Sequence, residues 1–237
     1  MVDSSMYNEF KDYASKHMGI SSMQLYYWER LQDSLYTHTT VSNSLTPMIL
    51  EERQLNVTQI DVFSRMMMDR ILWLCGPVND RMSTVVQAQL MYLDTIDQTD
   101  ITLHIDSPGG SVKSGLGIVD VMDYVSSDVM TINTGMAASM GAILLGAGTK
   151  GKRLMLPNSR VMIHQVSAGA QGTMADIDIS IAEGRKYNTK LFNMLSDYTG
   201  KTAKKIMKDA DRDMWLDAEE AKGYGIIDSI ITKKIKK

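Results

Sequence analysis

The sequence predicts an α/β fold in which strands and helices alternate along the chain and the strands form a parallel sheet. Three short apolar runs, at residues 71–75, 101–105 and 129–132, have the length and composition of buried strands. Segments with helical spacing separate these runs. Repeated strand–helix units imply right-handed crossovers, so we expect parallel strands with helices packed on the faces of the sheet.

The first 44 residues differ from the rest of the chain. Met6, Phe10 and Tyr13 recur at helical spacing, and residues 37–44 form a polar run with the composition of a linker. We therefore expect an N-terminal extension over residues 1–44, either a removable propeptide or a docking arm. One domain is expected over residues 45–237, because a chain of 237 residues fits one domain and an appendage better than two domains.

One strand–helix unit and a further strand lead to the glycine turn at residues 107–110, and a second helix follows that turn. Amphipathic helices are predicted over residues 81–96 and from residue 111 to about residue 125. In parallel sheets the functional crevice lies beyond the carboxyl ends of the strands. The glycine turn and Ser139 both follow strands, so we expect them at the same edge of the sheet.

Residues 135–141, Gly-Met-Ala-Ala-Ser-Met-Gly, are predicted to form a tight turn between a strand and a helix. Ser139 then lies at a helix N-terminus, where small neighbours let a substrate approach and backbone N–H groups face developing charge. This layout suits a nucleophile. A run of small residues is also typical of a packing seam between a helix and a sheet, so both interpretations are open at this point.

The later part of the chain is less regular. A strand is predicted over residues 160–165, followed by a glycine-containing loop at 167–172 and a long helix over 174–198 that ends at Gly200. The apolar positions of this helix are sparse, so we expect it to project from the domain and to need a partner surface. Asp217 and Glu220 resemble a capping box for a helix over residues 218–224, and a last strand is predicted at 226–231.

The composition excludes several classes of function. A net charge of −3 gives no general attraction to nucleic acid or to an anionic membrane. We expect a cytoplasmic protein, because no secretory signal and no membrane-spanning apolar run is recognisable. The single cysteine, Cys75, excludes an intramolecular disulfide, and its apolar neighbours predict that it is buried. Motifs for zinc, nucleotides and dinucleotides are absent from the sequence.

A nucleophilic serine needs a base to remove its proton and a carboxylate to orient that base. His104 lies in a predicted strand whose apolar and polar residues alternate, which indicates an ordinary sheet residue. His164 lies near a strand end, followed by a glycine-containing loop, and is the better candidate by elimination, with a purely structural histidine as the alternative. Asp209, Asp211 and Asp213 form an acidic cluster, which is typical of a solvated turn.

Gly109 and Gly110 form a second candidate part of the active site. Their backbone N–H groups, together with the N–H group of Met140, offer the donors of an oxyanion hole. A glycine turn alone is a weak indication of this role.

Four segments taken together resemble the signature segments of the ClpP family, the proteolytic subunits of Clp proteases. They are Ser-Pro-Gly-Gly-Ser at 107–111, the serine turn at 135–141, Val-Met-Ile-His-Gln at 161–165, and Asp-Arg-Asp at 211–213. They occur in the family's order and spacing, and the resemblance extends from about residue 45 to residue 228. It implies that Ser139 is the nucleophile, His164 the general base and then acid, and Asp213 the orienting carboxylate.

The resemblance also implies roles for backbone and interface positions. Oxyanion donors are implied at Gly109 and Met140, and contacts between two rings at Asp211 and Arg212. The implied fold is the one shared with crotonases, with a projecting handle over about residues 167–200 that interdigitates between two stacked seven-membered rings.

The resemblance further implies how such an assembly works. The active sites of the rings face an enclosed chamber, and an AAA+ unfoldase of the ClpX, ClpA or ClpC type threads unfolded proteins into it. The unfoldase uses the ATP, while peptide hydrolysis by this chain needs neither a metal nor another cofactor. We therefore expect a serine endopeptidase that cuts unfolded proteins into short peptides.

The chain departs from the family pattern at three positions. Val166 stands where the family usually has proline after His-Gln, and Thr102 and His104 stand where aromatic residues often build the docking pocket for the ATPase. These departures motivate one alternative, a specialised paralogue that acts mainly as a ring subunit in a mixed complex. A second alternative is a crotonase-type enzyme acting on acyl-CoA, which would share the oxyanion arrangement but would need no Ser-His-Asp set.

Overall fold

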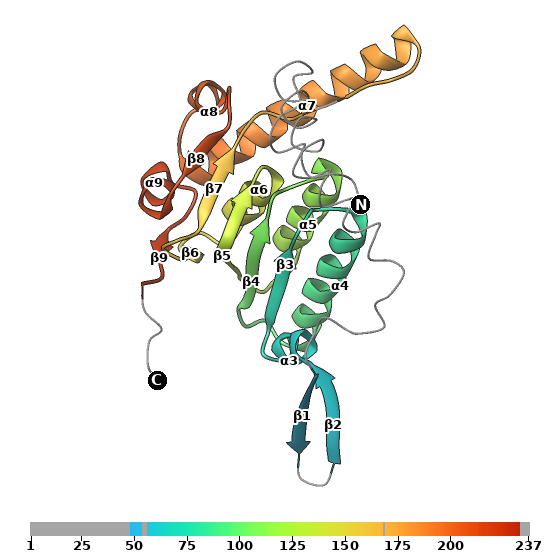
Figure 1. The fold of residues 1–237 in the computed structure, drawn as a ribbon, viewed down its shortest axis with the longest axis vertical. Coiled ribbons are helices and arrows are strands. Elements are labelled where there is room, and N and C mark those ends of the chain that lie inside the picture. Colours follow the sequence, from blue (N-terminus) through green and yellow to red (C-terminus); the bar gives the residue numbers. More distant parts are fainter. Residues whose placement is uncertain (1–47, 54–55, 168, 233–237) are drawn as a thin grey trace, which may run out of the picture. The chain divides into compact units, whose positions relative to one another are not determined.

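A computed structural model of the chain describes residues 48–53, 56–167 and 169–232 (Figure 1). The chain divides into two units, Met1–Met48 and Ile49–Lys237. The extension and linker predicted over residues 1–44 lie outside the described residues, so the following description concerns the second unit.

A seven-stranded sheet forms the centre of this unit (Figure 1). The strands β3, β4, β5, β6 and β9 follow one another in that order, and all these neighbours are parallel. The last part of β5 pairs with β7, also in parallel, and β8 is antiparallel to β7. The strands are β3 (Ile71–Cys75), β4 (Ile101–Ser107), β5 (Val129–Ala138), β6 (Arg153–Met155), β7 (Arg160–Ile163), β8 (Met214–Leu216) and β9 (Ser229–Ile230).

Helices connect these strands and confirm the predicted α/β class. Those that match predicted helices are α4 (Asp80–Ile96), α5 (Val112–Tyr124), α6 (Met140–Gly146), α7 (Met174–Thr199) and α9 (Ala218–Tyr224). The predicted capping box is present at α9, where Asp217 accepts from the N–H of Glu220 at 2.9 Å and the Glu220 carboxylate accepts from the N–H of Asp217 at 2.8 Å. None of the helices in the described part of the chain is long and apolar enough to cross a membrane.

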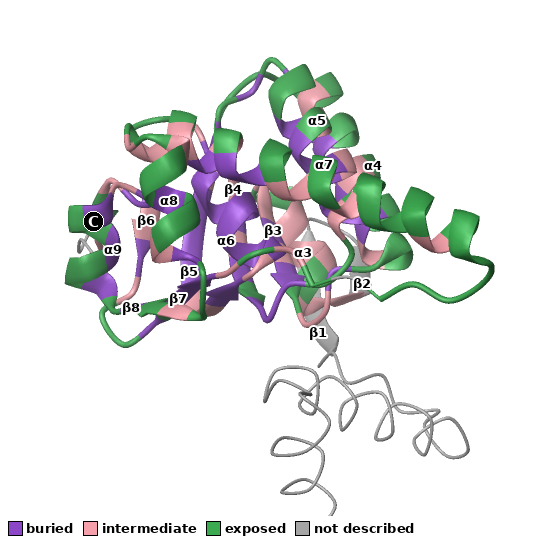
Figure 2. Cartoon of the chain, turned by 90° about the horizontal axis from the view of Figure 1, so that it is seen from above, coloured by how far each residue is buried: buried purple, intermediate pink, exposed green. Residues whose placement is uncertain are grey.

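The core packs the sheet against helices α4, α5 and α6, and it continues to the buried residues of α7, α8 and α9, such as Phe192, Ile206 and Ala221 (Figure 2). Alternate residues of the first two strands, such as Leu72 and Leu103, are fully buried, while the residues between them are partly exposed. Every residue of α6 is buried. Small and apolar residues are therefore required throughout α6, and this helix holds the end of β5 in a fixed place.

β5 is longer than the sequence predicted. Residues 135–138 continue the strand instead of forming a turn, because residues 136–138 pair with β7. Ala137 pairs with Ser107 of β4 on one side and with Val161 of β7 on the other. Glycine and alanine have low strand propensity, so only this pairing makes the segment extended.

Several short elements were not predicted. The hairpin β1 (Met48–Arg53) and β2 (Asn56–Asp61), the helices α3 (Val62–Met68) and α8 (Ala203–Asp209), and the strands β6 and β8 have little periodicity of their own. The predicted strand at 226–231 is confined to β9, Ser229–Ile230. Strands of two or three residues depend on the neighbour to which they bond, and a single segment does not reveal that neighbour.

The prediction that Cys75 is buried is wrong. Cys75 is exposed at the end of β3, because Leu72 and Leu74 take the buried face of this strand and the alternate positions face outward. On this outward side the indole of Trp73 stacks on the ring of His104, with ring centroids 4.5 Å apart and planes 12° apart. His104 is therefore a sheet residue, as the alternation of β4 predicted.

Helix α7 extends well past the sheet, as the sequence predicted (Figure 1). Only Leu191, Phe192 and Leu195, near its C-terminal end, are buried. Its N-terminal part exposes apolar side chains, with Ile179 68% accessible. The helix ends at Gly200, which adopts the left-handed conformation at φ 71°.

Candidate active site

Ser139 lies at the junction of β5 and α6 in a strained conformation. Its backbone has φ 54° and ψ −120°, and among the described residues only Arg70 shares a positive φ without being glycine. Such strain costs about 1–3 kcal/mol and persists only where the surroundings impose it. The Ser139 N–H donates to the carbonyl of Met162 at 2.8 Å, which fixes the turn to β7. The side chain makes no capping hydrogen bond with α6, so its hydroxyl is available for chemistry.

The glycine turn after β4 packs directly against this serine. A Cβ atom on Gly109 would lie 2.7 Å from Cβ of Ser139 and 2.9 Å from the amide nitrogen of Met140. Both distances are too short for any side chain, so this position requires glycine. The two turns therefore meet at the same edge of the sheet, as the strand order predicted.

Backbone N–H groups surround this contact. Met140 is the first residue of α6, and helices leave their first N–H groups without partners inside the helix. The N–H of Gly109 donates to Oγ of Ser107 at 3.1 Å, so it is already engaged. The N–H of the next residue, Gly110, makes no hydrogen bond to any described residue. The structure thus draws attention to Gly110, which the sequence suggested only as a member of the glycine pair.

His164 reaches the same edge because β7 runs parallel to β5. Ala138 pairs with Met162, so the residues just after these two strands, Ser139 and His164, come from adjacent strand ends. The side chain of His164 is 16% accessible. Burial lowers its pKa below the usual value, and the nearby Asp213 charge partly opposes this effect. The imidazole is therefore neutral at neutral pH and able to accept a proton.

Asp213 lies beside His164 because β8 is antiparallel to β7. Ile163 pairs with Met214, and the residues just outside this pair are His164 and Asp213. Nδ1 of His164 lies 3.6 Å from Oδ1 of Asp213, which is an ion-pair distance but longer than a hydrogen bond. The Asp213 side chain is 38% accessible, so it is more exposed to solvent than the histidine.

The other two acids of the cluster have different surroundings. The Asp209 carboxylate accepts from the ammonium group of Lys205 at 2.5 Å and from the hydroxyl of Tyr224 at 3.0 Å. Asp211 and Arg212 have exposed side chains, and the Asp211 carbonyl accepts from the Gln165 side chain at 3.0 Å. Only Asp213 of the three forms an ion pair with His164. His104, in register with Ile132 in the middle of β5, lies away from the strand ends.

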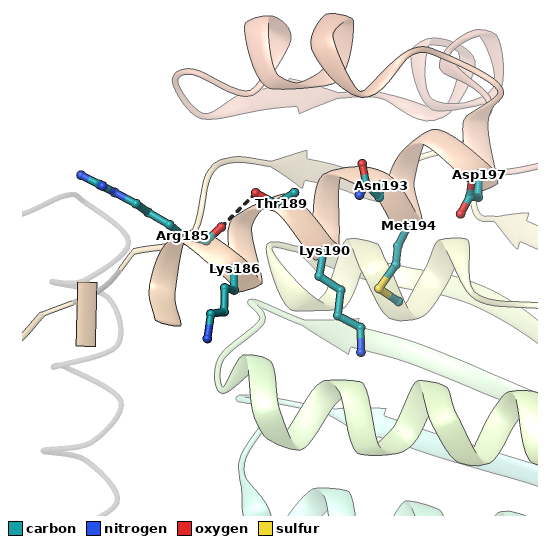
Figure 3. Close-up of a pocket in the computed structure, with 7 residues that line it drawn as sticks. All are labelled: Arg185, Lys186, Thr189, Lys190, Asn193, Met194 and Asp197. Atoms are coloured by element: carbon teal, nitrogen blue, oxygen red, sulfur yellow. Dashed lines mark hydrogen bonds between the residues drawn. The ribbon is translucent and has the colours of Figure 1, made fainter. Parts of the chain in front are cut away.

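A separate shallow pocket runs along α7. Its lining comes from this helix alone and includes three basic side chains (Figure 3). The lining residues are Arg185, Lys186, Thr189, Lys190, Asn193, Met194 and Asp197. None of the candidate catalytic residues lines it, so this pocket is separate from the candidate active site.

Comparison with known proteins identifies the family of this chain. A family model described as Clp protease matches residues 53–234. The chain is 50% identical over 228 residues to an ATP-dependent Clp protease proteolytic subunit of Bacteroides fragilis strain YCH46, covering 96% of this chain and 100% of the relative. It is 49% identical over 230 residues to the protein of the same name from Porphyromonas gingivalis strain W83, covering 97% and 100%. The chain belongs to the Clp protease family.

Proposed function

We propose that this chain is the proteolytic subunit of an ATP-dependent Clp protease and that it cleaves unfolded polypeptides through an acyl-enzyme on Ser139. As a member of the family it is a serine-type peptidase. The single observation that carries the assignment of residues is the strand register. β7 pairs with β5 and with β8. Ser139 follows β5, His164 follows β7 and Asp213 precedes β8, so the three residues lie at adjacent strand ends.

In the proposed reaction, Nε2 of His164 accepts the proton of the Ser139 hydroxyl while Oγ attacks the carbonyl carbon of the peptide. The tetrahedral intermediate collapses, the C–N bond breaks, and His164 gives its proton to the leaving amine. Water then attacks the acyl-enzyme, with His164 again as base, and releases the peptide acid. Asp213 orients the imidazole, and we expect the 3.6 Å separation to shorten when substrate is bound.

The oxyanion of the intermediate is proposed to bind the N–H groups of Met140 and of the glycine turn. Gly109 and Gly110 are the two candidates in that turn. The N–H of Gly110 has no hydrogen-bond partner among the described residues, which supports it as the donor, whereas the N–H of Gly109 already donates to Ser107. Removal of one such donor typically costs about 10²- to 10³-fold in turnover.

The proposed assembly consists of two stacked seven-membered rings. The exposed N-terminal part of α7 supports a role for the handle, residues 167–200, in joining the rings, because apolar side chains such as Ile179 are exposed in the described part of the chain. Exposed side chains at Asp211 and Arg212 are compatible with ring contacts. The proposed location is the cytoplasm, and neither nucleic acid nor membrane is among the proposed partners.

An AAA+ unfoldase is the proposed partner that supplies substrates and consumes ATP. Peptide hydrolysis by this chain is proposed to need no cofactor of its own, because the serine mechanism moves protons between side chains and water only. The stacked rings of Trp73 and His104 lie beside a small pocket that also includes Phe63. Related proteins often have aromatic docking residues at the positions of Thr102 and His104 on β4. Here Trp73, on the neighbouring strand β3, supplies an aromatic surface instead, and we propose this surface for docking of the unfoldase.

Labelling with a fluorophosphonate tests the catalytic assignment. The intact chain is expected to react once per subunit, and Ser139→Ala is expected to abolish the reaction. Ser126→Ala, which changes an exposed serine away from the site, is the matched control and is expected to react normally. Labelling that survives Ser139→Ala would refute the role of this serine. Inactive single rings that become active only with a second ClpP subunit would instead support the mixed-ring paralogue.

A further inference from the structure

The loop that carries His164 is bonded to the projecting helix. The N–H of Val166 donates a hydrogen bond of 2.9 Å to Oδ1 of Asn188, which lies on α7. Both residues are half-buried, so the bond is partly shielded from water. A backbone N–H can donate only to the oxygen of an amide side chain, so the bond also sets the orientation of the Asn188 amide.

The other contacts of this loop come from a different side. The N–H of Gln165 donates to the carbonyl of Ala210 at 3.2 Å, and its side chain donates to the carbonyl of Asp211 at 3.0 Å. Both acceptors belong to the segment that leads to Asp213. Asn188 therefore supplies the hydrogen bond between this loop and α7. The two residues after His164 are thus bonded to α7 on one side and to the segment at residues 210–211 on the other.

We propose that Asn188 is a positioning residue for His164 that acts through the N–H of Val166. This inference rests on the proposed function, because it concerns the base of that reaction. Asn188 contacts no reacting atom. It fixes the backbone two residues after the histidine and thereby holds the imidazole in place.

The bond depends on the identity of residue 166. Proline has no N–H, so a proline at this position would leave the Asn188 oxygen without this donor. Valine has the donor, and its half-buried side chain also packs against the core. The pair formed by Val166 and Asn188 thus replaces, by a hydrogen bond, the rigidity that a proline ring would give the loop.

The first test removes the acceptor. Asn188→Ala is expected to lower the rate constant for fluorophosphonate labelling of Ser139 by about 3- to 10-fold, the range expected for one net hydrogen bond. The kcat for a peptide substrate should fall equally while KM and the native mass of the assembly stay unchanged. Asn188→Asp keeps an oxygen acceptor and should restore most of the rate.

Asn193→Ala is the matched control on the same helix. Asn193 is exposed and makes no hydrogen bond to the described residues, so its removal should leave the labelling rate unchanged. An equal loss in this control would show that any change in α7 slows the reaction, which would contradict a specific role for Asn188.

A double-mutant cycle then tests the path through the backbone. Val166→Ala keeps the N–H, so in that background Asn188→Ala should lower the labelling rate as much as it does in the parent chain. Val166→Pro removes the N–H, so Asn188→Ala should have no further effect in that background. An Asn188→Ala effect of the same size in the proline background would overturn the inference.

The same measurements separate this inference from the proposed function. If the parent chain is not labelled at Ser139, the proposed function fails. If the parent chain is labelled and Asn188→Ala reacts at the same rate, only the positioning role fails.

Discussion

The surroundings of Ser139 and His164 set the backbone conformation of the serine and the pKa of the histidine. Strand pairing and a tight glycine contact hold the Ser139 backbone at φ 54°, and its hydroxyl is free of the helix cap. His164 is buried enough to have a lowered pKa, although it lies near the charge of Asp213. Its neutral form therefore predominates at neutral pH, and this is the form that a general base requires.

The pKa of His164 predicts how labelling depends on pH. The base acts only when it is neutral, so the labelling rate should be constant from about pH 7 upward and should fall as His164 is protonated in acid. Asp213→Asn removes the charge that raises this pKa, so the acidic fall in rate should move to lower pH. The plateau should also fall by about 10²- to 10⁴-fold, because the ring loses its orienting partner.

Rates of fluorophosphonate labelling measured across the pH range check this prediction for both proteins. A shift of the fall in rate toward higher pH in Asp213→Asn would contradict the assigned electrostatic effect.

At the scale of elements, two turns form the edge of the sheet that carries the proposed catalytic residues. The turn after β4 contacts the turn between β5 and α6 so closely that a Cβ atom on Gly109 would collide with Ser139. β7 and β8 extend the same edge and bring His164 and Asp213 alongside. The geometry of the site is therefore a property of packed strand ends and not of any one loop.

Gly109→Ala tests this contact. Alanine at φ 91° costs about 1–2 kcal/mol of conformational strain and, in addition, pushes against Ser139. A displacement of about 1 Å near the chemistry can cost roughly 10²-fold, so we expect labelling to fall at least that far.

Gly151→Ala is the matched control, since Gly151 has φ 89° but open space around the position of a Cβ atom. Gly151→Ala should lower the Tm because of the same conformational strain, while the labelling rate stays unchanged. Equal labelling losses in the two variants would mean that the contact with Ser139 does not matter.

The whole molecule has a feature that the packed unit alone does not explain. Helix α7 exposes Met174 and Ile179 at 74% and 68% accessibility, and three basic side chains line a shallow pocket along the same helix (Figure 3). Apolar side chains at such exposure are costly in water when they gather on one helix. We attribute them to the contact between rings in the proposed assembly.

Ile179→Glu tests this attribution. A buried charge without a partner destabilises an interface, so the double ring should dissociate to single seven-membered rings in native mass spectrometry. Ile96→Glu, which changes an exposed isoleucine at the end of α4, is the control and should leave the double ring intact. Persistence of the double ring in Ile179→Glu would argue against a ring contact at this part of α7.

The catalytic assignment could be predicted from the sequence to different extents. Ser139 and His164 follow apolar strand segments, and the local pattern alone marked them as candidates. Asp213 was chosen among three acids by family resemblance. The structure distinguishes it physically, because Asp209 is bonded to Lys205 and Tyr224 while the antiparallel pairing of β7 and β8 sets Asp213 beside His164.

The sequence by itself determined the order of the strand–helix units, the end of α7 at Gly200 and the capping box of α9, because these depend on periodicity and on neighbouring residues. Only the tertiary structure decided the full length of β5, the exposure of Cys75 and the bond between Val166 and Asn188. Each of these depends on a partner distant in the chain. A local pattern records what a residue prefers, whereas the folded sheet decides which backbone group, side chain or solvent it meets.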